Sequence, residues 1–179
     1  VRTPVAAATC VSCAIDRLRR VSAPRLSEFI KAYDVRGLVP QQLNDAVAFA
    51  IGSAFARVVA IADGATSIVV GHDMRESSPG LSRSFAEGAA AHGLDVTLIG
   101  LCSTDGLYYA SGALDVPGAM FTASHNPATY NGIKFSRAGA QGISLDTGLA
   151  RLRLRDALPG AQRAVAEASQ RAIERLLFL

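Results

Sequence analysis

The sequence predicts a three-layer α/β/α domain, in which helices cover both faces of a mixed, mostly parallel sheet. Short apolar runs alternate with longer amphipathic stretches between residues 32 and 136, and this alternation is typical of layered α/β domains. The chain has 179 residues, of which half are apolar and 18% are charged. A chain of this length and composition can build one hydrophobic core, which excludes intrinsic disorder as the main interpretation.

The first predicted strand and helix occupy residues 32–39 and 41–62. Pro40 ends the strand, because proline has no amide hydrogen to donate to a sheet. In the segment that follows, apolar residues recur at intervals of three and four, which predicts an amphipathic helix. Asp63-Gly64 is the expected stop.

A second strand and helix follow at once. Residues 67–71 form a continuous apolar run, which is typical of a strand that is covered on both faces. Pro79 opens the next helix, at a position where a missing amide hydrogen is tolerated best. We expect this helix to end at Gly93.

The remaining elements of the domain continue the alternation. Residues 95–100 predict a strand, and residues 104–111 predict a helix that Gly112 closes. Residues 117–121 form another apolar strand that runs into a polar loop. The chain then returns as a strand over residues 132–136.

The two ends of the chain depart from this pattern. Residues 1–25 show no clear period, and we expect a poorly ordered or helical lead-in there. The α/β domain is expected over residues 26–150. Residues 151–179 are rich in alanine, arginine and glutamate and predict a helical carboxyl-terminal extension. The initial valine and the apolar last residues lead us to expect a truncated chain.

Charge and hydropathy exclude several classes of function. The arginines are concentrated near both ends, and no aromatic interleaving or reading motif accompanies them, so nucleic-acid binding is not expected. No run of about 18 apolar residues occurs, so no membrane span is expected. The first residues lack the apolar block of a signal peptide. The expected location is therefore the cytoplasm.

The three cysteines give little functional information. Cys10 and Cys13 form a C-x-x-C pair, but no second pair exists to complete a zinc site. We expect two unpaired thiols there. Cys102 lies among apolar residues and is expected in the core.

Residues 122–135 contain the strongest candidates for catalytic side chains. Thr122-Ala123-Ser124-His125-Asn126-Pro127 follows an apolar strand, and Tyr130-Asn131-Gly132-Ile133-Lys134-Phe135 comes next. This order places a hydroxyl at the carboxyl end of a strand, where ligands bind in open α/β sheets. Taken singly, Ser124 is equally consistent with a turn or cap residue, and His125 with a hydrogen-bonded structural histidine.

Together these residues resemble the active-site serine loop of the α-D-phosphohexomutases, the family of phosphoglucomutases and phosphomannomutases. Three further segments, residues 31–37, 70–79 and 100–109, are similar to family segments in the same order. The last of them resembles the phosphomannomutase-type branch. The resemblance covers about residues 28–150 and implies the first, phosphoserine-bearing domain of the family.

The resemblance implies an exchange of phosphate between Ser124 and a sugar, which interconverts hexose 1-phosphate and hexose 6-phosphate through a bisphosphate. Such a transfer depends mainly on in-line positioning and charge neutralisation. Lys134 would supply a fixed cation. His125 would donate to a phosphate oxygen or move the proton of the sugar hydroxyl. These three residues are the expected catalytic group.

The resemblance also implies binding residues outside the serine itself. Tyr33 and Arg36 would lie near the phosphoserine, where Arg36 offers a bidentate fork to phosphate oxygens. Without the serine loop, Arg36 would be interpreted as a surface residue beside a turn glycine. Asn126 would hydrogen-bond the loop or the phosphate. Asp73 and Arg75 would be structural, as they usually are in the family.

The implied cofactors are Mg²⁺, bound through the phosphate on Ser124, and a hexose 1,6-bisphosphate as activator. The family's metal-binding Asp-Gly-Asp-Gly-Asp-Arg string does not occur in this sequence, and neither the sugar-recognition loop nor the substrate-phosphate loop of the family is found. We therefore expect a phosphosugar as ligand, weak or no activity from the chain alone, and dependence on a chain that supplies the missing domains.

Two alternatives stay open beside the enzyme hypothesis. A non-catalytic phosphosugar-binding or partner-dependent module would use the same loop for recognition. An unrelated hydrolase-like or phosphate-binding α/β domain would need a G-x-S-x-G elbow or a glycine-rich phosphate loop. Neither motif occurs in the sequence.

Overall fold

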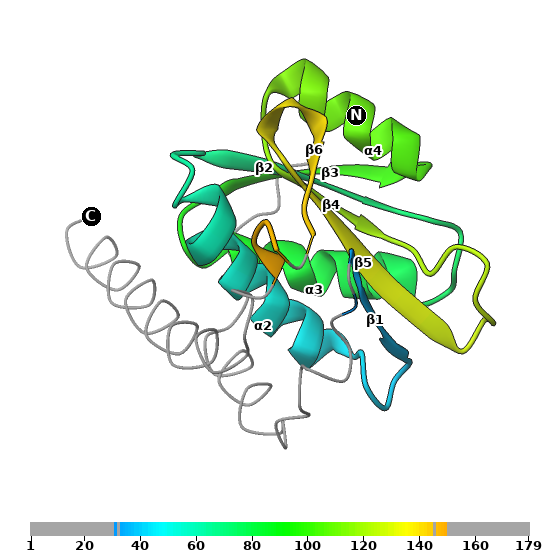
Figure 1. Ribbon diagram of the computed structural model, residues 1–179. Coiled ribbons are helices and arrows are strands. Elements are labelled where there is room, and N and C mark those ends of the chain that lie inside the picture. Colours follow the sequence, from blue (N-terminus) through cyan, green and yellow to red (C-terminus); the bar gives the residue numbers. More distant parts are fainter. Residues whose placement is uncertain (1–30, 32, 145, 150–179) are drawn as a thin grey trace, which may run out of the picture.

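The computed structural model describes residues 31, 33–144 and 146–149. The predictions for residues 1–25 and 151–179, including the thiols of Cys10 and Cys13, fall outside these described residues. Within them, a six-stranded sheet lies between helices on its two faces (Figure 1). The predicted three-layer α/β/α architecture is confirmed.

Six strands form one mixed sheet. They are β1 (Val35–Leu38), β2 (Ser67–His72), β3 (Asp95–Leu101), β4 (Gly118–Phe121), β5 (Tyr130–Arg137) and β6 (Gln141–Gly142). The order is β1-β5-β4-β2-β3, with β6 paired to β5. β2 is parallel to β3 and β4, whereas β5 is antiparallel to β1, β4 and β6. Among the described strands β5 alone is reversed, so the sheet is mixed and mostly parallel in strand direction.

The helices divide between the two faces. They are α2 (Asp45–Phe55), which continues as the π-helical turn η2 (Ala56–Ala60), α3 (Ser78–Ala90), α4 (Thr104–Leu114) and the short 3₁₀ turn η3 (Ala138–Ala140). α2 and α3 lie together against one face of the sheet and α4 lies on the opposite side (Figure 1). Over the described residues, no helix has both the length and the apolar character needed to cross a bilayer.

The first helix begins later than predicted. Residues 39–43 form a turn in which the amides of Gln42 and Leu43 both donate to the Leu38 carbonyl oxygen. Asn44 then caps α2, because its side-chain oxygen accepts from the Val47 amide at 3.0 Å. The apolar periodicity could not show this, since Leu43 is buried although it precedes the helix.

The helix α4 ends later than predicted. Gly112 was expected to close it, but the helix continues to Leu114, and Asp115 adopts the left-handed conformation with φ 51°. Aspartate tolerates this conformation better than most non-glycine residues. The Val116 amide donates to the Ser111 carbonyl oxygen, which closes the helix end.

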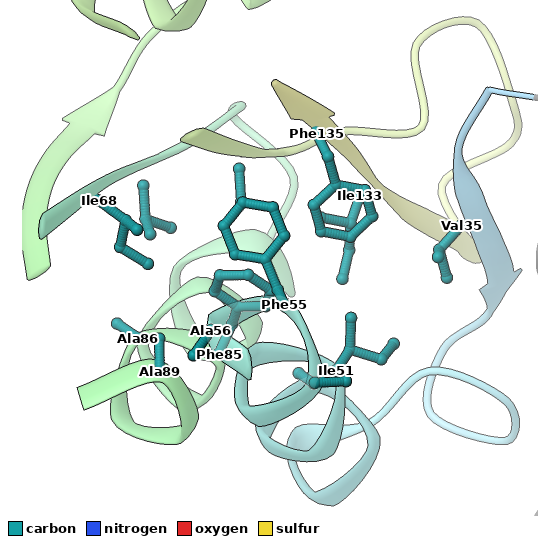
Figure 2. Close-up of a cluster of buried hydrophobic side chains, with 14 of the residues drawn as sticks. Val35, Ile51, Phe55, Ala56, Ile68, Phe85, Ala86, Ala89, Ile133 and Phe135 are labelled. Carbon is teal, nitrogen blue, oxygen red and sulfur yellow. The ribbon is translucent and has the colours of Figure 1, made fainter. Parts of the chain in front are cut away.

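The main core lies between the sheet and the pair α2 and α3, where Phe55, Phe85 and Phe135 lie close together (Figure 2). Phe121 belongs to the same cluster. Phe55 stacks on Phe135 at a centroid distance of 5.2 Å, and Phe85 meets the edge of Phe121 at 5.6 Å. All four side chains are fully buried. Such ring pairs add about 0.5–1.5 kcal/mol each beyond the area they bury, so they anchor both helices to β4 and β5.

A smaller core lies under α4, on the opposite face of the sheet. Val69, Leu107 and Met120 are buried there, and the half-buried Cys102 packs against them. The Cys102 thiol is 3.7 Å from the Met120 sulfur. Burial raises the pKa of this thiol. Cys102 therefore contributes to the core as expected, although it is not fully enclosed.

Candidate active site

The serine loop and the Asp73–Arg75 segment meet at one edge of the sheet. β1, β2, β3 and β4 run in the same direction, so their carboxyl ends share this edge, and the reversed β5 begins there. The serine loop follows β4, and the Asp73–Arg75 segment follows β2. The structure thus places the serine where α/β sheets bind ligands.

Ser124 is held in an unusual backbone conformation with its side chain exposed. Its φ is 52°, in the left-handed region that L-residues other than glycine, asparagine and aspartate rarely adopt. Its amide donates to the Thr122 hydroxyl oxygen at 3.0 Å, and its carbonyl oxygen accepts from Arg75. Backbone contacts on both sides therefore fix the residue and leave the hydroxyl free for chemistry.

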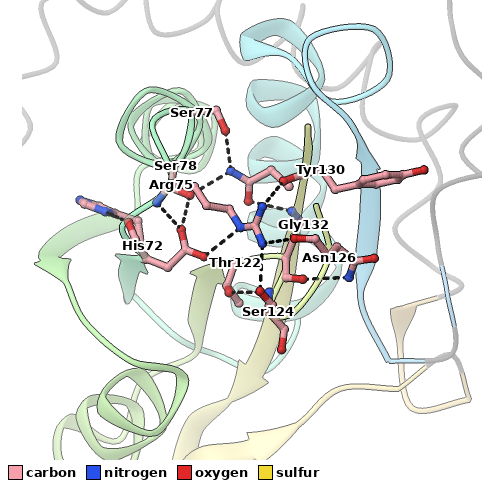
Figure 3. Close-up of polar contacts among 12 residues, drawn as sticks. His72, Arg75, Ser77, Ser78, Thr122, Ser124, Asn126, Tyr130 and Gly132 are labelled. Atoms are coloured by element: carbon pink, nitrogen blue, oxygen red, sulfur yellow. Dashed lines mark hydrogen bonds and ion pairs between the residues drawn. The ribbon is translucent and has the colours of Figure 1, made fainter. Parts of the chain in front are cut away.

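The guanidinium of Arg75 binds four carbonyl oxygens of the serine loop (Figure 3). Nη2 donates to the oxygens of Ser124 at 2.9 Å and Asn126 at 2.7 Å. Nη1 donates to those of Pro127 and Tyr130, both at 2.9 Å. One planar group thus ties together the loop between β4 and β5.

Asp73 orients the arginine. Its carboxylate lies 3.4 Å from Arg75 Nε and also accepts from the Arg75 amide at 3.0 Å. The Ser78 hydroxyl donates to the same carboxylate at 2.6 Å, at the start of α3. Asp73 and Arg75 therefore serve the backbone of the loop, in agreement with the structural role that the resemblance implied.

Asn131 completes the link between the loop and α3. Its amide nitrogen donates to the hydroxyl oxygens of Ser77 and Ser78 at 2.8 and 2.9 Å, and its side-chain oxygen accepts from the Gly132 amide at 2.8 Å. The side chain is fully buried, so each of these bonds replaces one that water would otherwise make. No role was assigned to Asn131 from the sequence, although a polar residue at the start of an apolar strand is a usable signal.

Two of the predicted residues follow Ser124 in the same loop. His125 is exposed, and its Nδ1 lies 3.5 Å from the Ser124 hydroxyl oxygen, the outer limit of a hydrogen bond. Asn126 donates from its side-chain nitrogen to the Ala123 carbonyl oxygen at 2.8 Å. Of its two suggested partners, the loop or a phosphate, the structure shows the loop.

The two predicted cations lie on one face of the sheet. Arg36 on β1 is paired with Gly132 on β5, and Lys134 follows two residues later on the same strand. Because side chains alternate along strands and cross-strand partners share a face, Arg36 and Lys134 project to the same side. Lys134 is half-buried and, within the described residues, forms no side-chain hydrogen bond or ion pair.

Arg36 already has a protein partner for part of its guanidinium group. It forms an ion pair with Asp34 at 2.5 Å, and its Nε is buried without a hydrogen-bond partner in the described part of the chain. Tyr33 is 71% exposed and lies just before this strand. The structure therefore brings Ser124, His125 and Asn126 together in one loop. It places Arg36 and Lys134 on the adjoining strands β1 and β5, and Tyr33 just before β1, without a direct bond to the serine.

The described residues do not fit a complete magnesium site. Among them, no group of three or more histidine, cysteine, aspartate or glutamate side chains is arranged to hold a metal ion. Asp73, the acidic residue beside the serine loop, is committed to Arg75 and Ser78. A phosphate on Ser124 would bring one oxygen ligand, and the other ligands would have to come from elsewhere.

The fold and the site define a class: an α/β/α domain that presents an exposed serine at the carboxyl edge of a mixed sheet. The sequence model of the phosphoglucomutase/phosphomannomutase family, alpha/beta/alpha domain I, matches residues 28–149. The chain belongs to this family.

Relatives support the assignment at the level of sequence. The chain is 45% identical over 124 residues to a protein of Xanthomonas campestris named phosphohexose mutases. The aligned region covers 69% of this chain and 27% of that protein. The chain is 42% identical over 120 residues to the phosphomannomutase of Salmonella montevideo, covering 66% and 25%. The chain thus spans about a quarter of the length of these curated relatives.

Solved structures show the same fold. A phosphoglucomutase/phosphomannomutase family protein from Burkholderia thailandensis matches with a TM-score of 0.59 and 31% identity, covering 79% of this chain and 30% of that one. A structure from Thermus thermophilus matches with a TM-score of 0.68 and 31% identity, covering 80% and 32%.

Proposed function

We propose that this chain is the phosphoserine domain of a phosphohexomutase that interconverts hexose 1-phosphate and hexose 6-phosphate, with Ser124 as the phosphate carrier. The observation that carries the proposal is the geometry of Ser124. Its backbone is fixed on both sides by Thr122 and Arg75, while its side chain is exposed at the carboxyl edge of the sheet. A residue that must accept and return a group needs this combination of fixed position and access.

The proposed exchange has two symmetric steps. A hydroxyl oxygen of a hexose phosphate attacks the phosphorus on Ser124, the bond from phosphorus to the serine oxygen breaks, and a hexose bisphosphate forms. The sugar loses its hydroxyl proton and the serine oxygen gains one. The serine oxygen then attacks the other phosphorus of the bisphosphate, the bond from that phosphorus to the sugar oxygen breaks, and the sugar oxygen takes up the proton that the serine loses. We assign this proton transfer to His125, because its Nδ1 lies 3.5 Å from the serine hydroxyl oxygen.

A phosphate on Ser124 would carry about 1.5 to 2 negative charges at neutral pH. Arg75 has no terminal N–H group left for the phosphate oxygens, because both of its terminal nitrogens already donate to carbonyl oxygens. Lys134 and Arg36, on one face of the adjoining strands, are the cations left for this purpose. Tyr33 and Asn126 stay predicted contacts of the phosphate or the sugar.

Magnesium and a hexose 1,6-bisphosphate activator are part of the proposal. Magnesium would neutralise charge on the transferred phosphate when bound, with an oxygen of the Ser124 phosphate as one ligand. The activator would load the serine with phosphate at the start. The phosphosugar as substrate and the cytoplasmic location likewise remain predictions for this chain.

We expect little mutase turnover from the chain alone. The described residues offer no carboxylate set for the metal, and the acidic metal-binding string of the family does not occur in the 179 residues. The same observation favours a second candidate, a partner-dependent module. In that case the domain would bind a phosphosugar, and another chain would supply the metal ligands.

Phosphate uptake at Ser124 tests the proposal. The chain is incubated with glucose 1,6-bisphosphate and Mg²⁺, and the intact mass and the phosphorylated peptide are measured. We expect a single phosphate on Ser124 and none in Ser124→Ala. Ser144→Ala is the matched control, because Ser144 forms its side-chain hydrogen bonds with Thr147 beyond β6 and should leave uptake unchanged. A folded wild-type chain that takes up no phosphate would refute the carrier role.

A further inference from the structure

Every terminal N–H group of Arg75 has an acceptor in the serine loop. This sets Arg75 apart from Arg36, the other described arginine of the site. Nη1 and Nη2 carry four hydrogens, and four carbonyl oxygens between Ser124 and Tyr130 accept them. Nε faces the Asp73 carboxylate at 3.4 Å. All five donors of the guanidinium fork are directed at protein acceptors. Arg75 therefore has no donor left for a ligand, although it lies beside the candidate phosphate carrier.

The contact with Ser124 is the one that matters for the side chain. The left-handed backbone of Ser124 persists only where the surroundings fix it on more than one side. The Thr122 hydroxyl fixes the amide, and Arg75 Nη2 fixes the carbonyl oxygen. If the arginine contact is lost, φ of Ser124 can relax from 52° toward the common negative range, and the direction of the Cα–Cβ bond changes with it.

We propose that Arg75 is a positioning residue for phosphate transfer: it orients the Ser124 hydroxyl through the loop backbone without touching the phosphate. This inference rests on the proposed function of Ser124. The clamp reaches from the loop after β2 to the loop after β4 (Figure 3), so the orientation of the serine depends on a segment about fifty residues earlier in the chain.

Lysine cannot replace arginine in this role. The four carbonyl oxygens are bound by two nitrogens of a planar fork, whereas a lysine ammonium is a single point with three donors. The Arg75→Lys variant therefore keeps the positive charge and loses most of the clamp. Arg137 offers the matched control, because its guanidinium ties Asp63 and the Thr147 carbonyl oxygen at the other end of β5.

Amide hydrogen exchange followed by mass spectrometry measures the clamp independently of any chemistry. Wild type, Arg75→Lys and Arg137→Lys are compared for a peptide that covers residues 122–131 and for peptides from α2 and α3. We expect faster exchange in the 122–131 peptide of Arg75→Lys alone, because the loop opens locally while the core stays closed. Unchanged exchange in this peptide would overturn the inference, and so would an equal increase throughout the domain.

The rate of phosphate uptake at Ser124 from glucose 1,6-bisphosphate completes the test, at a temperature well below the unfolding midpoint of every variant. We expect a fall of about 100-fold in Arg75→Lys, the order of loss that follows when a reacting group is displaced by about 1 Å, and no fall in Arg137→Lys.

If Arg75→Lys does not fold, Arg75→Gln, which keeps two planar N–H donors, enters the same two measurements. If wild type takes up phosphate and the Arg75 variant does so at the same rate, the positioning role is overturned and the proposed function is not. No uptake by folded wild type overturns the proposed function, and the positioning role with it.

Discussion

At the scale of single residues, the site contains two kinds of side chain: those that hold the serine loop in place and those that remain available to a ligand. Arg75, Asp73 and Asn131 are engaged with the loop and with the start of α3. Lys134 has no such engagement within the described residues. A cation held half-buried on a strand without a partner is suited to binding an anion.

Lys134→Met tests this distinction. We expect phosphate uptake at Ser124 to fall by about 10²-fold, in the range found when one preorganised donor is removed from a site of charge development. The midpoint of thermal unfolding should change little, because Lys134 forms no bond in the described fold. Arg83→Met, which removes an exposed cation from α3, is the control. Equal uptake in both variants and wild type would show that Lys134 does not face the phosphate.

The position of Ser124 could be predicted from the sequence, but its left-handed backbone conformation could not. The strand that ends in a small hydroxyl residue predicted the position of the serine, and the structure places it at the expected edge. Its backbone angle was not predictable, because it depends on carbonyl contacts to Arg75, which lies 49 residues earlier. Asn131 was missed for the same reason, since its partners belong to the start of another helix.

At the scale of elements, the close contact of α2 and α3 depends on two glycines. A Cβ atom on Gly52 would lie 2.1 Å from the Phe85 carbonyl oxygen, and one on Gly88 would lie 2.1 Å from that of Phe49. Both obstacles are backbone atoms, which cannot rotate away. The helices therefore pack with their backbones in contact, and this places Phe55 and Phe85 against the sheet.

Gly88→Ala should separate the two helices. We expect the free energy of unfolding to fall by about 1–3 kcal/mol, the usual result of overpacking a close-packed interior, as measured by urea denaturation. Gly80→Ala is the matched control in the same helix, because its Cβ would meet only the Asp45 carboxylate oxygen at 3.8 Å. Equal stability of the Gly88 variant and wild type would contradict the backbone contact.

The order of β1 to β5 and of α2 to α4 was predictable, whereas β6, η3 and several element ends were not. Apolar runs and Pro79 predicted β2, β3, β4 and the start of α3, because local sequence determines these features. The ends depended on context. Asp115 closes α4 in place of Gly112, and the turn before Asn44 delays α2. Both outcomes follow from hydrogen bonds that apolar periodicity does not record.

At the scale of the whole molecule, the reversed direction of β5 brings the site together. The loop from β4 to β5 turns back at the carboxyl edge, so the serine and the strand that bears Lys134 share it with the arginine loop after β2. Sequence alternation predicted the layers, but the strand order β1-β5-β4-β2-β3 depends on pairing between distant segments. In the proposed function, the described domain supplies the phosphate-carrying serine and the cations. Because no group of carboxylates among the described residues is arranged to hold a metal ion, the proposal does not include efficient turnover by this chain alone.

Transfer of phosphate from Ser124 to a sugar tests the central claim most directly. The chain is loaded with radiolabelled phosphate on Ser124, freed of donor, and mixed with glucose 1-phosphate or mannose 1-phosphate in the presence of Mg²⁺. We expect the label to leave the protein, slowly but only when a hexose phosphate is present, and to be recovered in a hexose bisphosphate. Label that stays on Ser124, or that leaves at the same rate in buffer alone, would contradict the role of this serine as a phosphate carrier.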